Sequence, residues 1–274
     1  MTLSKRLLIA FALLAAAPLA YAFWWEPDSL RVGAYDVTVD APALKGLTIA
    51  VISDLHAGAP WIDGAKIEAV VATANAARPD LILLAGDYVS DRGDGSLRMP
   101  LEDIATHLKG LDAPLGVYAV LGNHDDNVGG RRVSAALGQA GILVLNNTHA
   151  VVGRQQGSLI VAGIDTWTGP ADGREALRGL EQQKVLCLTH MPYLFAELPP
   201  ACVLTVAGHT HGGQVALPLV RAWALRRTSL RGPWHAQGVI REGGRTLFVS
   251  PGIGTTFLPV RLGVPPEISL LRIR

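Results

Sequence analysis

Cysteine is scarce in this sequence: the 274 residues include only Cys187 and Cys202, and no CxxC pattern occurs. This scarcity excludes a structural zinc site built from paired cysteine motifs. Both cysteines lie in apolar, strand-like runs, so we interpret them either as two buried thiols or as one disulfide, which an exported protein permits. An excess of charge is missing too, because 24 Lys and Arg balance 23 Asp and Glu, and this argues against a general nucleic-acid-binding protein.

Internal repeats, low-complexity tracts and linkers are also absent after residue 46. Short apolar runs alternate there with segments of helical periodicity, which predicts one α/β domain. Strands are expected at 49–52, 81–84, 117–121, 142–145, 159–164, 185–188, 203–206, 246–250 and 268–273, with 142–145 beside 159–164. Helices are expected at 63–77, where Asp63 is the cap, and at 100–108, 131–140 and 173–182.

The N-terminus carries a long uncharged apolar run at residues 7–25. The run is long enough to span a bilayer, and Lys5 and Arg6 before it favour an orientation that exports the rest of the chain. The triplet Ala20-Tyr21-Ala22 also resembles a signal-peptidase site, so cleavage is the alternative to a membrane anchor. Either alternative places the rest of the chain outside the cytoplasm.

These features divide the chain into three parts. Residues 1–25 are expected to be a signal anchor or signal peptide. Residues 26–45 form a lead-in segment with an edge strand at 37–39, and residues 46–274 form the main domain. Oligomeric state cannot be deduced from any of these patterns.

Asp54 and His56 directly follow the apolar run at 49–52 and stand two residues apart. In an extended chain such side chains point the same way, so one carboxylate and one imidazole are expected to converge at the carboxyl edge of a sheet. This donor pair suits a divalent cation such as Mn, Fe or Zn. Taken alone, the pair fits equally well with a helix-capping aspartate and an ordinary loop histidine.

The same pattern recurs at four later strand ends, and together the five ends hold five of the eight histidines. Glycines precede three of the polar residues, which predicts tight turns between strand and loop. The residues at the five ends are, in order, Asp54 with His56, Asp87, Asn123 with His124, His190, and His209 with His211.

In this order the blocks resemble the motif set of the calcineurin-like metallophosphoesterases. The matching blocks are Asp54-Leu55-His56, Gly86-Asp87-Tyr88-Val89, Gly122-Asn123-His124-Asp125, His190 and Gly208-His209-Thr210-His211. The resemblance covers residues 46–274 and implies a four-layer α/β/β/α sandwich, preceded here by an N-terminal hydrophobic helix. The apolar N-terminus, Gly212-Gly213-Gln214 and Gly252-Ile253-Gly254 resemble the membrane-associated or exported branch of that family.

The resemblance also implies a site for two divalent metal ions, Mn, Fe or Zn, with Mg as a further possibility. Such ions, about 4 Å apart, neutralise phosphate oxygens and generate the attacking hydroxide. His124 would be the catalytic residue that stabilises developing charge or protonates the leaving oxygen. The implied ligands are Asp54, His56 and His211 for one ion, Asn123, His190 and His209 for the other, and Asp87 as the bridge.

One block departs from the family pattern. Many members read G-D-x-x-D, with the last aspartate orienting the catalytic histidine, whereas this chain has Ser90 there and Asp91 one place later. The partner of His124 is therefore left open between Asp91, Asp125 and no carboxylate at all.

The resemblance implies a hydrolase that cleaves a phosphodiester or pyrophosphate bond, expected here in a membrane lipid or glycolipid. Phospholipid phosphodiesterases and UDP-2,3-diacylglucosamine pyrophosphatases of lipid A biosynthesis are the reference enzymes, although UDP-linked lipids face the cytoplasm while the charge pattern predicts export. A soluble periplasmic phosphodiesterase or phosphomonoesterase is the alternative, and a non-catalytic metal-binding scaffold is a third. No nucleic-acid partner is expected.

A basic, tryptophan-containing segment at 218–231 is expected to be a loop near the last metal block. It would grip a phosphate or a lipid headgroup, lie on an anionic membrane, or be an ordinary solvated loop. His107 and His149 are expected to be surface residues, and Asp165 a turn residue. His235 belongs with the undecided segment.

Overall fold

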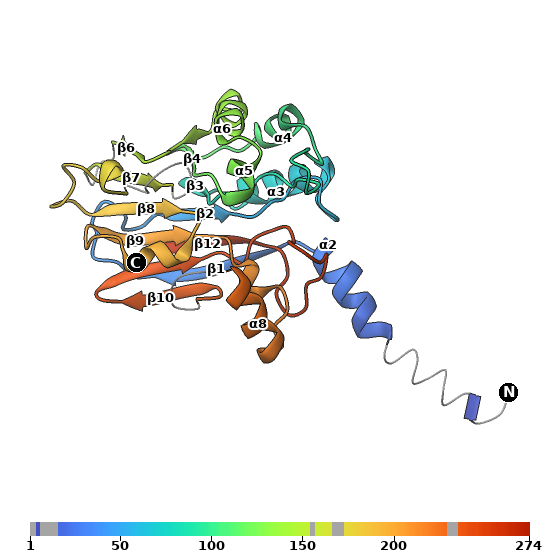
Figure 1. Ribbon diagram of the computed structural model, residues 1–274. Coiled ribbons are helices and arrows are strands. Elements are labelled where there is room, and N and C mark those ends of the chain that lie inside the picture. The colour runs from blue at the N-terminus through green and yellow to red at the C-terminus, as the bar shows by residue number, and fades with distance from the viewer. Residues whose placement is uncertain (1–3, 6–15, 154–156, 166–172, 229–234) are drawn as a thin grey trace.

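The computed structural model describes residues 4–5, 16–153, 157–165, 173–228 and 235–274. Within these ranges the chain forms two six-stranded mixed sheets (Figure 1). The first runs in the order β1 (Arg31–Val37), β12 (Glu267–Ile273), β2 (Thr48–Ile52), β3 (Leu81–Leu84), β4 (Val117–Ala119), β5 (Leu143–Val144). Strands β2 to β5 are parallel, and β12 is antiparallel to β2.

The second sheet contains the later motif-bearing strands. Its order is β10 (Gly238–Glu242), β11 (Arg245–Val249), β9 (Cys202–Ala207), β8 (Val185–Thr189), β7 (Leu159–Ile164), β6 (Thr148–Val152). The four central strands β11, β9, β8 and β7 are parallel, whereas β10 and β6 add antiparallel edges. Buried parallel strands have continuous apolar sequences, so their positions could be predicted well from the sequence.

The two sheets pack face to face across a core that includes Val51 and Leu83 from one sheet and Leu188 and Val206 from the other. Helices α3 (Gly64–Ala76), α4 (Leu101–Leu108) and α6 (Gly130–Gln139) cover the outer face of the first sheet and lie together in Figure 1. Helix α7 (Gly173–Ala176) and the short helix η2 (Pro192–Ala196) border the outer face of the second. The predicted four-layer α/β/β/α arrangement is therefore present.

Several helix boundaries follow from local chemistry. The Asp63 carboxylate accepts a hydrogen bond of 2.8 Å from the Lys66 backbone N–H and caps α3, as predicted. Pro100 precedes α4, and its fixed φ suits a helix start. A short helix, α5 (Asn123–Asn127), begins directly at the third metal block.

Three predictions of local structure were wrong. Strand β7 lies in the second sheet and is not a neighbour of β5, because β6 forms an antiparallel hairpin with it. Helix α7 is much shorter than predicted, and a turn at Gly179, with φ +78°, follows it. The segment predicted as a basic loop forms helix α8 (Pro218–Thr228), since a proline at the first position and the Ala, Leu and Arg residues after it favour helix. Arg231 lies outside the described residues.

The N-terminal part differs in detail from the prediction. The edge strand is β1, six residues earlier than expected, and it pairs in parallel with β12. Residues 16–28 are helical, including the π-helix η1 (Tyr21–Trp25) and α2 (Glu26–Asp28). Residues 7–15 of the predicted apolar run lie outside the described residues. In the part of the chain that is described, no helix is long and apolar enough to cross a membrane.

Cys187 in β8 and Cys202 in β9 form a disulfide, with their Cα atoms 5.6 Å apart. Both cysteines are completely buried. Of the two interpretations left open by the sequence, the structure therefore has the cross-linked one. The bond ties together the two strands that carry His190 and His209 at their ends.

Candidate metal centre

The ends of β2, β3, β8 and β9 bring the predicted ligands to one place. Their donor atoms form three overlapping groups, and within each group all atoms lie within 4.8 Å of one another. The groups are Asp54, His56 and His211; His56, Asp87 and His124; and Asp87, His190 and His209.

Ring nitrogens face each other across the centre of each cluster. The Nε2 atoms of His56 and His211 are 3.1 Å apart, and Nδ1 of His209 is 3.1 Å from Nε2 of His190. Nitrogens that bind one ion at about 2.0–2.1 Å lie roughly 3 Å from each other, so this spacing fits ligands of a shared cation. Asp87 Oδ2 lies 3.2 Å from His190 Nε2 and 3.7 Å from His56 Nε2. It thus lies between two metal clusters, the first formed by Asp54, His56 and His211 and the second by Asp87, His190 and His209.

Asn123 completes the predicted set in a different way. Its Oδ1 atom is buried and has no hydrogen-bond partner among the described residues. A buried carbonyl oxygen without a partner is costly and calls for an explanation. An amide oxygen is a suitable ligand for a hard divalent cation, so the orphaned atom fits the expected role.

The backbone reaches this arrangement through strained turns. Asp54, His56, Asp87, His209 and His211 all have left-handed φ values between +49° and +71°. Residues other than glycine rarely adopt this conformation, and such strain concentrates at functional sites. The prediction that Asp54 and His56 converge was right, but its reason was wrong: β2 ends at Ile52, and tight turns rather than an extended chain direct the two side chains.

The glycines before the polar residues serve two purposes rather than the one expected. Gly86 has φ +91°, as a sharp turn requires. Gly122 and Gly208 instead permit close approach, because a Cβ atom would lie 2.1 Å from Asp87 Oδ1 in the first case and 1.9 Å from Ser53 Oγ in the second.

A second layer of hydrogen bonds fixes the ligands. His190 Nδ1 donates to the Ala85 carbonyl at 2.8 Å, and His211 Nδ1 to the Gly254 carbonyl at 3.2 Å, which directs both Nε2 atoms toward the clusters. The Asp54 carboxylate accepts bonds from Ser53 Oγ at 2.5 Å and from the His209 backbone N–H at 3.1 Å. Hydrogen bonds therefore orient three of the candidate ligands, His190, His211 and Asp54.

Burial and charge set the protonation of the histidines. Burial lowers the pKa of His56 to about 4 and that of His211 well below its ordinary value, so both rings are neutral at pH 7, the form that binds metals. Burial also acts to lower the pKa of His190, but the adjacent Asp87 carboxylate outweighs it and raises the pKa to about 10. Positive charge, as a proton or a metal ion, is thus stabilised beside Asp87.

The structure distinguishes the two possible partners of His124. Its Nδ1 atom lies 3.4 Å from Asp91 Oδ2. The Asp125 carboxylate is completely buried and accepts bonds from the backbone N–H groups of four residues, Asp87, Tyr88, Val89 and Gly122. Asp125 therefore holds two motif loops together, and Asp91 is the carboxylate next to His124.

Sequence reasoning missed Arg261, which is one of the largest fully buried side chains among the described residues. Its guanidinium donates to the carbonyls of Pro251, Gly252, Gly254 and Val264. The Gly254 carbonyl also accepts the bond from His211 Nδ1, so Arg261 holds in place a backbone group that orients His211. No motif marked it, because an isolated arginine in a loop is ordinarily exposed.

Glu26 was also missed, since its position after an apolar run suggested only a flanking charge. The side chain is buried, and its carboxylate accepts bonds from the backbone N–H groups of Gly263 and Val264 at 2.9 and 2.6 Å. The backbone N–H of Arg261 donates to the Ala22 carbonyl at 3.0 Å. The N-terminal helix is therefore joined to the loop that supports His211.

A cleft of about 520 Å³ opens beside the clusters and is lined by His56, His124, Arg92 and Arg98 among others. The two arginines are exposed, and Arg98 Nε donates to the Asp91 carbonyl at 3.2 Å. Guanidinium groups bind phosphate oxygens in bidentate fashion. The cleft thus combines a cation-binding wall with positive charge suited to a phosphate ester.

The remaining histidines lie outside the clusters. His107 Nδ1 is 2.9 Å from Glu68 Oε1 on the helical face, and His149 Nδ1 donates to the Ala176 carbonyl at 2.9 Å. His235 is 3.9 Å from Glu242. Asp165 follows β7, and its backbone N–H donates to Asn147 Oδ1.

Residues 47–221 match the family Calcineurin-like phosphoesterase. The chain is 31% identical over 262 residues to an uncharacterized metallophosphoesterase of Aquifex aeolicus, covering 91% of this chain and 94% of the relative. It is 31% identical over 237 residues to the phosphodiesterase YaeI of Escherichia coli, covering 82% and 81%. The chain therefore belongs to the calcineurin-like phosphoesterases and is a hydrolase acting on phosphoric esters.

Proposed function

We propose that the chain hydrolyses a phosphodiester or pyrophosphate bond at a dinuclear metal centre. Asp54, His56 and His211 would hold one ion, Asn123, His190 and His209 would hold the other, and Asp87 would be shared by both. The observation that carries the proposal is the position of Asp87 Oδ2 between His56 of one cluster and His190 of the other.

The residues around the centre divide the remaining work. When bound, two divalent cations such as Mn, Fe or Zn neutralise the phosphate and activate water for in-line attack. His124 stands at the border of the clusters and the cleft, where it protonates the leaving oxygen. Asp91 lies 3.4 Å from His124 Nδ1 and orients the ring. Arg92 and Arg98 bind the ester oxygens on the cleft side.

The substrate we propose is a lipid or glycolipid that faces the outside of the cytoplasmic membrane. The buried Cys187–Cys202 disulfide supports export, because such bonds persist in oxidising compartments. Trp24 and Trp25 of the N-terminal helix are 62% and 73% exposed, as suits aromatic side chains at a membrane surface. Export argues against a UDP-linked lipid at the cytoplasmic face and favours a phospholipid or an exported glycolipid.

Retention of the N-terminal segment is the form we favour over release at Ala22. The potential cleavage triplet lies in a helix, and the Ala22 carbonyl is bonded to Arg261. Cleavage would remove this contact next to the metal centre. N-terminal sequencing of the protein from fractionated cells tests this: a mature protein that begins at Phe23 and is free of membrane would contradict anchoring.

The proposed activity is tested by hydrolysis of bis-p-nitrophenyl phosphate with Mn²⁺-reconstituted protein. The variants Asn123→Ala and His124→Ala should each lose roughly 10²-fold or more, since one loses a ligand and the other a transition-state donor. His107→Gln is the matched control, because His107 is a histidine outside the clusters, and should retain the parent rate. Equal rates in the parent and both cluster variants would refute the assignment.

A further inference from the structure

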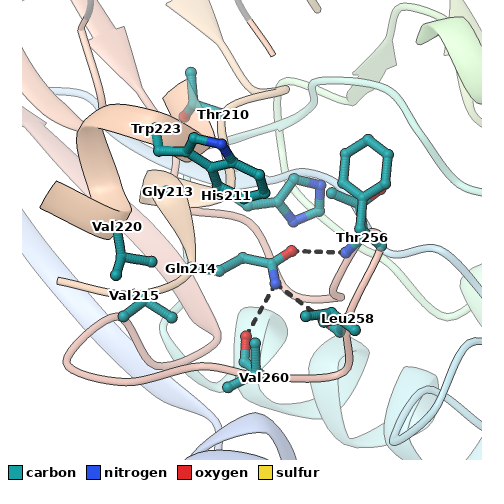
Figure 2. Close-up of a pocket in the computed structure, with 11 residues that line it drawn as sticks. Thr210, His211, Gly213, Gln214, Val215, Val220, Trp223, Thr256, Leu258 and Val260 are labelled. Atoms are coloured by element: carbon teal, nitrogen blue, oxygen red, sulfur yellow. Dashed lines mark hydrogen bonds between the residues drawn. The ribbon is translucent and has the colours of Figure 1, made fainter. Parts of the chain in front are cut away.

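A second cavity adjoins the metal centre at His211 and shares Thr256, Phe257 and Leu258 with the arginine-lined cleft. It has a volume of about 190 Å³ and lies between α8 and the loop at 256–260 (Figure 2). His211 forms part of its wall, as it does of the first metal cluster. The same loop also borders the basic cleft, through Phe257 and Leu258. The cavity and the cleft are therefore two parts of one site that meet at the metal centre.

The polar side chains in the cavity wall already have partners. The Gln214 amide donates to the carbonyls of Leu258 and Val260 at 3.0 Å each and accepts from the Thr256 N–H at 2.7 Å, as Figure 2 shows. Thr210 Oγ1 donates to the Ala236 carbonyl at 2.6 Å, and His211 Nδ1 to Gly254. These groups serve the protein's own structure, so the cavity offers a ligand mainly apolar surface.

The entrance of the cavity is apolar as well. Val220 and Trp223 from α8 and Phe257 and Leu258 from the loop all line it, and their exposures range from 40% to 83%. Single exposed apolar residues are ordinary, but several around one opening mark a binding surface. Two separate elements thus contribute apolar side chains to the same mouth.

The size of the cavity limits what can enter. A buried apolar cavity of roughly 150 Å³ accommodates benzene, so this one takes a short alkyl segment or the first part of a longer chain. Its open, apolar entrance lets the remainder of such a chain extend along the exposed side chains of α8. A charged or strongly hydrated group would lose its water there without gaining bonds.

We infer that this cavity binds an alkyl or acyl chain covalently attached to the phosphate that is hydrolysed at the metal centre. The inference rests on the function proposed above and specifies its substrate as an amphiphilic, lipid-type phosphodiester. The phosphate lies in the arginine-lined cleft, and the chain passes His211 into the apolar cavity. Metal centre and cavity then act on one molecule.

The test uses the Mn²⁺-reconstituted full chain and a series of p-nitrophenyl alkyl phosphates, with methyl, butyl and hexyl groups, below their micelle concentrations. In the parent, kcat/KM should rise roughly tenfold or more from methyl to hexyl, because each fully buried methylene contributes up to about fourfold. Val220→Asp places a charge at the cavity wall and should flatten this rise. Trp223→Gln, which removes apolar surface without adding charge, should reduce it.

Leu219→Asp is the matched control, since Leu219 precedes Val220 on α8 and is 87% exposed but does not line the cavity. It should keep the parent's dependence on chain length, and circular dichroism should show all three variants folded. A parent rate that does not depend on chain length, or a rise retained in both cavity variants or lost in the control, overturns the inference. Such results leave the proposed metal-dependent hydrolysis intact, whereas failure of the parent to hydrolyse any diester removes the diesterase activity on which the inference rests.

Discussion

The metal centre and the apolar cavity share His211 but are built in opposite ways. The centre consists of mostly buried side chains near the ends of parallel strands, held by left-handed backbone turns and by bonds to buried carbonyls. The cavity is formed by a helix and a loop with exposed apolar side chains, and its polar groups bond to nearby backbone. The side chains of the metal centre are thus held rigidly, whereas the exposed side chains around the cavity select which ester binds.

The largest loss of activity should come from Asp87→Asn, which changes the metal centre alone and removes the negative charge that lies between the two clusters. We expect a loss of roughly 10²-fold or more in the hydrolysis of every diester, whatever its chain length, because both ions depend on this carboxylate. Metal content by mass spectrometry should fall below two ions per chain. Asp112→Asn, an exposed substitution of the same kind, should change neither quantity.

The contrast between the metal centre and the cavity also explains which parts of the site could be predicted from the sequence. The strands β2, β3, β8 and β9 could be predicted because buried parallel strands are continuous apolar runs, and the candidate ligands because they lie within a few residues of the end of such a run. Within one block, however, the sequence could not decide between Asp91 and Asp125. That choice depends on four backbone N–H groups that converge on Asp125 only in the folded chain.

The surroundings of the centre were beyond sequence reasoning for a related reason. Arg261 donates to four nearby loop carbonyls, and Glu26 accepts from two backbone N–H groups more than 200 residues away in the sequence. Such contacts leave no periodic pattern in the sequence. The cavity depends on the course of the loop at 256–260 against α8, a segment predicted as a loop. Long-range contacts between irregular segments are decided by tertiary packing.

The second prediction concerns close packing at the centre. In Gly208→Ala the new Cβ would lie 1.9 Å from Ser53 Oγ and 2.7 Å from Asp54 Oδ2, so the β2 and β9 turns must move apart. We expect about a 10²-fold loss of activity, because misplacement by about 1 Å is enough to produce it, together with a lower melting temperature. Gly138→Ala, on a helix with open space around the new Cβ, should retain activity and melt at the same or a higher temperature. Similar behaviour of the two variants would argue against tight packing at Gly208.

The third prediction tests support from behind the ligands. Arg261→Met keeps much of the side-chain volume but removes every bond from the guanidinium to the loop carbonyls. One of these carbonyls, that of Gly254, also accepts a bond from His211 Nδ1. Metal affinity, measured by titration of the apo protein, should fall roughly 10- to 100-fold, as is typical when a partner behind a ligand is lost. Burial lowers the pKa of Arg261 only to about 10, so the parent is charged at pH 7. The exposed Arg272→Met should bind metal like the parent.

The smallest effect is expected for Asp91→Asn, which keeps the shape of the side chain near His124 but removes its charge. The contact between His124 Nδ1 and Asp91 Oδ2 is long, at 3.4 Å, and both side chains are partly exposed to water, so the interaction is weak. We expect kcat for bis-p-nitrophenyl phosphate to fall about tenfold with metal affinity unchanged, because Asp91 belongs to none of the ligand clusters. Asp94→Asn in the same loop caps only Ser96 and should leave kcat unaltered. If Asp91→Asn instead loses metal, the carboxylate supports the ligands rather than His124, and the catalytic histidine works without a charged partner.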